Sequence, residues 1–142
     1  MAKQIFVNLP VADVAAATRF YEALGFEKNA QFSNPQGSGM QWSDTIFVML
    51  LDHALFATFN PKRIADARTE TSALLALGFD SRAEVDAITQ AAIAAGGREA
   101  HDPEDLGFMY SRAFEDLDGH AWGPFTMDVA AHAKAMAGEQ GA

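Results

Sequence analysis

The sequence predicts an α+β protein made of two copies of one βαβββ unit. Its 142 residues suit a single domain with a buried core. In each half of the chain a strand, a helix and further strands follow in the same order. That order recurs after about 70 residues, as expected of an internal repeat. The expected parts of the one domain are unit one at about 3–54, a linker helix at about 60–70, unit two at about 71–128 and a tail at 129–142, with a short helix at 129–136.

The first unit begins with an apolar strand at 5–9, which Pro10 ends. Asp13 is a suitable N-cap, and the apolar residues that follow it at helical spacing predict a helix up to Leu24. Gly25 can adopt a positive φ without steric cost, so it suits the position directly after that helix.

A turn and two strands complete the first unit. The Asn-Pro-Gln-Gly sequence at 34–37 is a turn signal, and the stretches at 40–42 and 45–51 predict two strands. Asn60 and Pro61 then have the character of an N-cap and first helical residue, which predicts the linker helix.

The second unit repeats this order. An apolar strand is expected at 73–77. Ser81 and Glu84 have the spacing of a capping box, and the helix that they begin stops at the two glycines 96–97. The remaining elements are strands at 108–114 and 121–127, with a turn at 116–119 between them.

The composition limits the kind of function. The formal net charge of −9 argues against binding to nucleic acid or to anionic membrane surfaces. The absence of cysteine excludes disulfides, thiolate metal sites and cysteine nucleophiles. The N-terminal residues show no signal-peptide pattern and no apolar run reaches membrane-spanning length, so a cytoplasmic protein is expected.

Two motifs lie at opposite ends of the repeat. Near the C-terminus the sequence is Asp-Leu-Asp-Gly-His at 116–120, and after Asp13 it carries Phe-Tyr at 20–21 and Leu-Gly-Phe at 24–26. The pair resembles the vicinal-oxygen-chelate superfamily of glyoxalases, bleomycin resistance proteins and extradiol dioxygenases. The resemblance implies curled mixed sheets around a shared cavity for a small molecule, and a homodimer. It covers nearly the whole chain and identifies the fold rather than the chemistry.

The resemblance also implies four metal-ligand positions, none of which holds a metal ligand here. Counting seven residues back from the N-cap aspartate leads to Phe6, and counting four residues on from the turn glycine leads to Gly123. The other two positions correspond to Met49 and Leu74. None of these side chains offers a hard donor to a divalent ion, so neither a metal nor another cofactor is expected.

Other polar side chains could form a site of a different kind. His53 and His120 could make a relocated metal site with a carboxylate, although both also suit solvated loops. Asp116 and Asp118 could be a catalytic pair, but aspartate favours turns because it bonds its own backbone, so turn caps are the preferred interpretation.

Strand alternation predicts which side chains line the cavity that the resemblance implies. Its lining is largely apolar, with Asn8 as the main polar group. Gly123 favours an open pocket, since glycine in a strand often marks the close approach of a ligand or another backbone; alternatively, these side chains fill a core. The predicted ligand-binding residues are Phe6, Asn8, Phe47, Met49, Leu51, Leu74, Gly123 and Phe125, with Tyr110 and Arg112 on a strand near the mouth.

Three functions are consistent with such a site. The first is metal-free binding of a small, partly apolar molecule, for which the negative charge suggests a cationic or aromatic ligand. The second is a glyoxalase-like lyase or isomerase, or a dioxygenase-like enzyme, with a relocated metal. The third is a protein that binds no ligand and acts through its dimer surface.

Overall fold

The computed structural model describes the backbone of residues 3–141 and their side chains other than those of 132, 135 and 138–141. The chain forms two compact units: residues up to 72 together with 116–120, and 73–115 together with those from 121 onward. Each unit contains a βαβββ series with its own four-stranded mixed sheet, which confirms the predicted α+β class.

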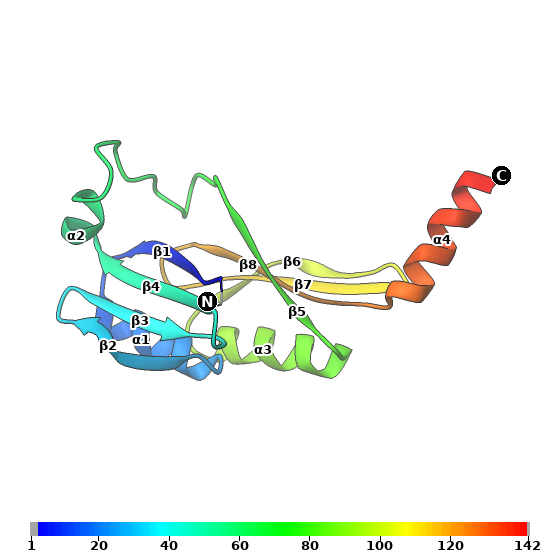
Figure 1. Cartoon of the computed structure of the whole chain (residues 1–142), viewed down its shortest axis with the longest axis horizontal. Helices are drawn as coiled ribbons and strands as arrows, with labels where there is room; N and C mark the ends of the chain where they lie inside the picture. The colour runs from blue at the N-terminus through cyan, green and yellow to red at the C-terminus, as the bar shows by residue number, and fades with distance from the viewer. Residues whose placement is uncertain (1–2, 142) are drawn as a thin grey trace. The chain divides into compact units, whose positions relative to one another are not determined.

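The first unit is a four-stranded sheet with one main helix against it (Figure 1). The strand order is β1-β4-β3-β2, in which β1 runs parallel to β4 and the other pairs are antiparallel. The elements are β1 (Ile5–Val11), α1 (Val14–Ala23), β2 (Glu27–Asn34), β3 (Gly37–Gln41), β4 (Ile46–Asp52) and the short α2 (His53–Ala57).

The core of the first unit lies between α1 and one face of its sheet. Val11, Met40 and Leu50 are fully buried on this face. The hydroxyls of Thr18 on α1 and Ser38 on β3 share a buried hydrogen bond of 2.7 Å, so the polar groups of this interface are paired. Every second residue of β1 and β4 points to the opposite face, away from α1.

The predicted helix ends are confirmed in both units. Asp13 caps α1 by accepting a 3.0 Å hydrogen bond from the backbone N–H of Ala16, and Gly25 after the helix has φ +103°. In the second unit the hydroxyl of Ser81 accepts from the N–H of Glu84, which is the N-cap bond of the predicted capping box, and it donates to the carboxylate of Glu84.

The second unit has the same topology. Its strand order is β5-β8-β7-β6, with β5 parallel to β8, and α3 packs against one face of the sheet. The elements are β5 (Leu74–Phe79), α3 (Arg82–Ala94), β6 (Arg98–Asp105), β7 (Met109–Glu115), β8 (Ala121–Met127) and α4 (Val129–Gly141). The last helix extends beyond the predicted 129–136. Among the described residues, no helix is long and apolar enough to cross a membrane.

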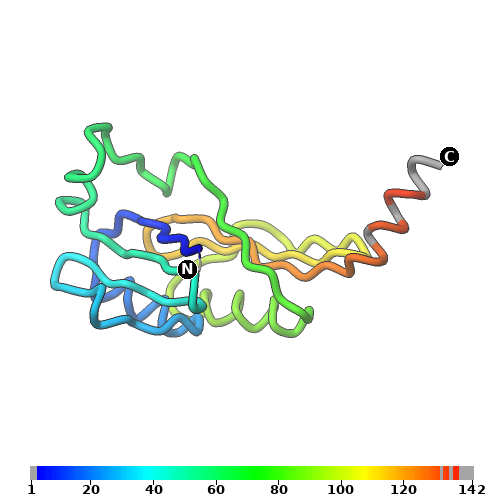
Figure 2. The backbone as a smooth tube through the Cα atoms, viewed as in Figure 1, coloured from blue at the N-terminus to red at the C-terminus, as the bar shows by residue number. Residues whose placement is uncertain are grey.

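The predicted linker helix is not formed. Residues 58–73 contain only turns and irregular backbone, and Figure 2 traces them as an uncoiled path after α2. Side-chain oxygens hold this path by local bonds: Asn60 accepts from the N–H of Lys62, and Asp66 from the N–H of Arg68. The bond from the N–H of Lys62 to Asn60 has the form of an N-cap bond, but no helix follows it.

Candidate functional site

Three phenylalanines cluster on the face of the first sheet opposite α1. Phe6 on β1 stacks on Phe47 on β4, with ring centroids 4.6 Å apart and planes inclined by 7°. Phe32 on β2 meets the two rings edge-on, at 5.8 and 5.7 Å. Phe47 is 4% exposed, whereas Phe6 is 39% and Phe32 is 43% exposed. These three residues, named the aromatic face below, therefore present aromatic surface to solvent.

Phe32 reaches this face through an irregularity in β2 and a glycine in β3. The register between the strands shifts between Asn29 and Asn34. Where the register shifts, the hydroxyl of Ser33 bonds the backbone of both strands: it donates to the carbonyl of Asn29 and accepts from the N–H of Gly39. A Cβ on Gly39 would lie 2.7 Å from Cβ of Phe32, which is closer than real side chains allow. Gly39 thus permits the close approach of Phe32.

The other predicted residues of the first unit share this side of the sheet. Phe6 pairs in register with Phe47, and Asn8 with Met49, so all four point away from α1. Asn8 is exposed and donates a 3.3 Å hydrogen bond to the carbonyl of Phe6, which leaves its own amide oxygen available. Leu51 points the same way but is buried.

The predicted residues of the second unit lie on the face of its sheet opposite α3. Gly123 on β8 pairs with Ala76 on β5, and Leu74 and Phe125 follow on the same face by strand alternation. Leu74 is 79% exposed. A Cβ on Gly123 would meet only the carbonyl oxygen of Arg112, at 3.9 Å, so the space beside this glycine is open.

The structure does not bring Tyr110 and Arg112 to that face. Tyr110 on β7 pairs with Thr126, which alternates with Phe125, so its side chain points toward α3. There its hydroxyl donates a 2.6 Å hydrogen bond to Asp86 of α3. Arg112 pairs with Asp86 and with Glu99 of β6. The two residues tie α3 to its sheet instead of lining the open face.

These ion pairs shift several pKa values in the second unit. The hydroxyl of Tyr110, with a further contribution from Arg112, lowers the pKa of Asp86, and the same hydrogen bond raises the pKa of Tyr110. Arg82 donates two hydrogen bonds to Asp105 and lowers the pKa of that carboxyl to about 2. Each of these charges is already engaged within the protein.

The turn at 116–120 belongs to the first unit, where Asp116 is its buried centre. One carboxylate oxygen accepts a 2.5 Å hydrogen bond from the hydroxyl of Tyr21. The other accepts from the backbone N–H groups of Asp118 and His120, both at 2.9 Å. Burial raises the pKa of Asp116. These bonds match the role of turn cap predicted for this residue.

The rest of the turn holds two other segments of the first unit, the end of β1 and the linker. Asp118 accepts a hydrogen bond from the N–H of Ala12, and Nε2 of His120 donates to the carbonyl of Pro10, which fixes the proton on that nitrogen. Arg68 donates to the carbonyl of Leu117. A Cβ on the turn glycine, Gly119, would lie 2.8 Å from the backbone next to Arg68, so only glycine lets the linker pack this closely.

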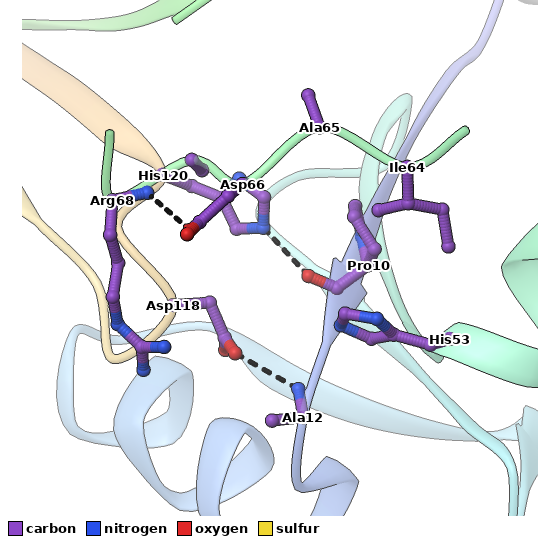
Figure 3. A pocket seen from close by; sticks show the side chains of 10 residues that line it. Pro10, Ala12, His53, Ile64, Ala65, Asp66, Arg68, Asp118 and His120 are labelled. Carbon is purple, nitrogen blue, oxygen red and sulfur yellow. Dashed lines mark hydrogen bonds between the residues drawn. The ribbon is translucent and has the colours of Figure 1, made fainter. Parts of the chain in front are cut away.

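A cavity of about 280 Å³ lies where these segments meet (Figure 3). It is named the linker pocket below. Figure 3 shows the side chains of His53, Asp118 and His120 together with the linker stretch 64–68. The lining residues are Pro10, Ala12, His53, Ile64, Ala65, Asp66, Ala67, Arg68, Asp118 and His120. The histidines proposed for a relocated site therefore do line one cavity.

The donors do not suit a divalent metal. The four positions that the family uses hold Phe6, Met49, Leu74 and Gly123, which have no hard donor atom. In the described part of the chain, no three His, Asp or Glu side chains come close enough together to hold an ion. In addition, Nε2 of His120 is committed to a carbonyl oxygen.

The sequence interpretation did not single out Phe32 or the linker pocket. Phe32 is the lone aromatic residue in a mostly polar strand, and that isolation was the available signal. The pocket depends on backbone contacts between distant segments, of which only the glycine of the 116–120 turn gave a hint.

Comparison with known proteins identifies the family. The sequence model of the Glyoxalase/Bleomycin resistance protein/Dioxygenase superfamily matches residues 3–123, and the chain belongs to this superfamily. Among curated proteins, none matches the sequence.

Solved structures share the fold. A hypothetical protein from S. aureus is 27% identical, with a TM-score of 0.75 over 89% of this chain and 95% of that one. A glyoxalase/bleomycin resistance protein/dioxygenase family enzyme from Burkholderia phytofirmans is 22% identical, with a TM-score of 0.70 over 89% and 99%. The fosfomycin resistance protein from Mesorhizobium loti is 16% identical, with a TM-score of 0.67 over 94% and 98%. The last two likenesses concern the fold alone.

Proposed function

We propose that this chain binds a small, partly apolar molecule against its aromatic face, without a metal ion at the family's ligand positions. The carrying observation is the exposure of Phe6 and Phe32, which stack and pack edge-on around the buried Phe47. Aromatic rings are large apolar groups that usually lie inside a protein, so a pair held in fixed geometry at the surface favours a ligand or partner there.

The ligand class that fits best is aromatic or cationic. A planar ring can stack on Phe6 or meet the edge of Phe32, and a cation is attracted to the faces of both. The net charge of −9 adds a long-range attraction for cations. Asn8, next to Phe6, supplies the polar group that would orient the molecule.

The same proposal assigns roles to the other residues on the open faces. Met49 would widen the apolar surface beside Phe47. The buried Leu51, on the same side of the sheet, would pack beneath that surface. In the second unit Leu74, Gly123 and Phe125 form the ligand-binding set, because they share the face opposite α3. Tyr110 and Arg112 are left out, since their side chains are bonded on the other face.

We further propose a cytoplasmic homodimer. Both sheets have edge strands and exposed apolar side chains, such as Phe6 and Leu74, and association can cover such surfaces. A dimer that binds no ligand is the competing use of the aromatic face.

An enzyme with a relocated metal is the alternative from another class. It would need three or more donors at one place. His53, His120 and Asp118 are the nearest candidates, yet His120 and Asp118 already bond the backbone of Pro10 and Ala12. Purified protein is expected to carry less than about 0.1 equivalent of zinc, nickel, manganese or iron. Stoichiometric metal in elemental analysis would favour the enzyme instead.

The binding proposal is tested with proflavine, a planar aromatic cation, by fluorescence titration. Phe6→Leu and Phe32→Leu are expected to weaken binding about five- to tenfold each, because a lost aromatic contact costs about 1 kcal/mol. Phe59→Leu is the matched control: Phe59 is also an exposed phenylalanine, but it lies in the linker. Equal effects of all three changes, or no saturable binding of proflavine, would contradict the proposal.

A further inference from the structure

The linker pocket contains opposite charges that are not paired with one another. Arg68, Asp66 and Asp118 all line it. Among the described residues the guanidinium of Arg68 forms no ion pair with either carboxylate. Asp66 and Arg68 are exposed and Asp118 is half-buried, so a ligand in the pocket can reach all three charged groups.

Each of the three side chains keeps unused bonding capacity. Asp118 uses one oxygen for the N–H of Ala12, and Asp66 uses one for the N–H of Arg68, so each retains a second oxygen. Arg68 donates from one nitrogen to the carbonyl of Leu117, and its other N–H groups remain. The imidazole of His53, at the start of α2, makes no hydrogen bond with another described residue.

The pocket is also shaped by the fold. Its walls come from the end of β1, the start of α2, the linker and the 116–120 turn, and the bonds of Asp118, His120 and Arg68 hold these segments in place. A volume of about 280 Å³ is slightly below the range of drug-sized ligand sites, so it suits a molecule of about ten heavy atoms or fewer.

A second cavity, in the other unit, lacks this property. It has a volume of about 430 Å³ and is lined by Arg82, Tyr110 and Asp128 among others. Its only lining cation, Arg82, is already paired with Asp105 by two hydrogen bonds. No charge of this cavity is left to recognise an anionic group.

We propose that the linker pocket binds a small zwitterion that carries one ammonium and one carboxylate group, as free amino acids do. The carboxylate contacts Arg68, and the ammonium contacts the second oxygens of Asp118 and Asp66. His53 borders the site and reports on its occupancy. None of these residues belongs to the aromatic face, so the inference does not depend on the proposed function.

The test compares probes of matched chain length by NMR titration of the full chain at pH 7. The zwitterions are glycine, 3-aminopropanoate and 4-aminobutanoate. For each, the amine and the carboxylate of the same chain length serve as singly charged controls. The ring signals of His53 are followed. We expect at least one zwitterion to bind about tenfold more tightly than both of its controls, a difference of about 1.4 kcal/mol.

Two isosteric variants separate the two ends of the ligand. Arg68→Gln keeps one donor for the carbonyl of Leu117 and is expected to reduce the affinity of the zwitterion to that of its amine. Asp118→Asn keeps the acceptor for Ala12 and should reduce it to that of the carboxylate. Asp66→Asn removes the second acidic group and should likewise lower the affinity for the zwitterion by weakening the contact with its ammonium group. Arg82→Gln, in the other unit, is the control and leaves the affinity unchanged.

The proposal is overturned if no zwitterion binds more tightly than its matched amine and carboxylate. It is equally overturned if Arg68→Gln and Arg82→Gln have the same effect in proteins whose amide spectra show an intact fold. Failure of this test leaves proflavine binding untouched, because the two sites share no residue.

Discussion

The hydroxyl of Tyr21, in the last turn of α1, donates a 2.5 Å hydrogen bond to the buried carboxylate of Asp116. The two residues are separated by 95 positions in sequence, yet both belong to the first unit. The bond joins the Phe-Tyr motif to the Asp-Leu-Asp-Gly-His motif, so the two parts of the sequence signature meet at one point.

Loss of this bond is expected to destabilise the protein. Tyr21→Phe leaves a buried carboxylate without its phenol donor, which costs about 1–3 kcal/mol. Tyr110→Phe is the matched control. It removes a similar phenol–carboxylate bond, but Asp86 is only half-buried and keeps Arg112 as a partner. Urea unfolding measures both, and a larger loss for Tyr110→Phe would contradict the central role of Tyr21.

The pH dependence of stability isolates Asp116. Burial raises its folded-state pKa above the ordinary 3.8, so the stability that it contributes is fully present below 3.8 and is lost as the pH rises through the folded pKa. Asp116→Asn keeps an acceptor for the two backbone donors but cannot ionise. In urea unfolding the wild type should therefore lose stability relative to this variant as the pH rises above 3.8. A relative gain would mean that the hydrogen bonds to the carboxylate outweigh its burial.

The pair of Arg82 and Asp105 is tested by direct titration. The pKa of Asp105 is about 2, so the stability from this pair is present above 3.8 and is lost as the pH falls toward 2. In Arg82→Gln the carboxyl pKa should rise toward its ordinary value, although the bond from the N–H of Gly107 still lowers it. The pKa of Asp105 in the wild type and in the variant is measured by following the carboxyl carbon signal with pH by NMR. Arg98→Gln, which affects the pair with Glu115, should leave Asp105 unchanged.

Two glycine substitutions should differ sharply. In Gly39→Ala the new methyl group meets Cβ and the backbone of Phe32, so the aromatic ring must move. We expect a cost of about 1–3 kcal/mol and weaker proflavine binding. Gly123→Ala places its methyl group in open space and should be tolerated. Thermal unfolding checks both variants and the dye titration checks Gly39→Ala, and a similar loss of stability in the two variants would refute the role assigned to Gly39.

Sedimentation velocity tests the proposed association. The chain has a mass of 15.3 kDa, so a dimer should sediment with twice that mass at micromolar concentration. Its uncovered sheet faces and edges provide the driving force. A species of monomer mass across the micromolar range would remove this proposal.

The sequence was informative where local chemistry decides the structure. The cap at Asp13, the capping box at Ser81 and the positive φ of Gly25 follow from residue type and spacing. Strand alternation likewise put Phe6 and Asn8 on one face. Each of these depends on residues only a few positions apart.

The sequence was uninformative where contacts between distant segments decide the structure, and where a strand at the edge of a sheet is mostly polar. Strands β2 and β6 lie at sheet edges and are mostly polar, so no alternating apolar pattern marks them. Asn60 forms the cap-type bond that its sequence suggests, yet no helix follows it in the linker, so the capping signal alone did not decide the local structure. Arg112 was expected near a cavity mouth, but its partners Asp86 and Glu99 sit on α3 and β6 and draw it to the other face.

The turn at 116–120 also dictates when the first unit can be finished. Tyr21, Ala12 and Pro10 have hydrogen-bond partners that are synthesised 95, 106 and 110 positions later, respectively. A nascent chain of 72 residues holds every strand of the first sheet but none of these partners. Its last folding step must await the second repeat, and a gene fragment cut between the repeats would encode a unit without its own closing piece.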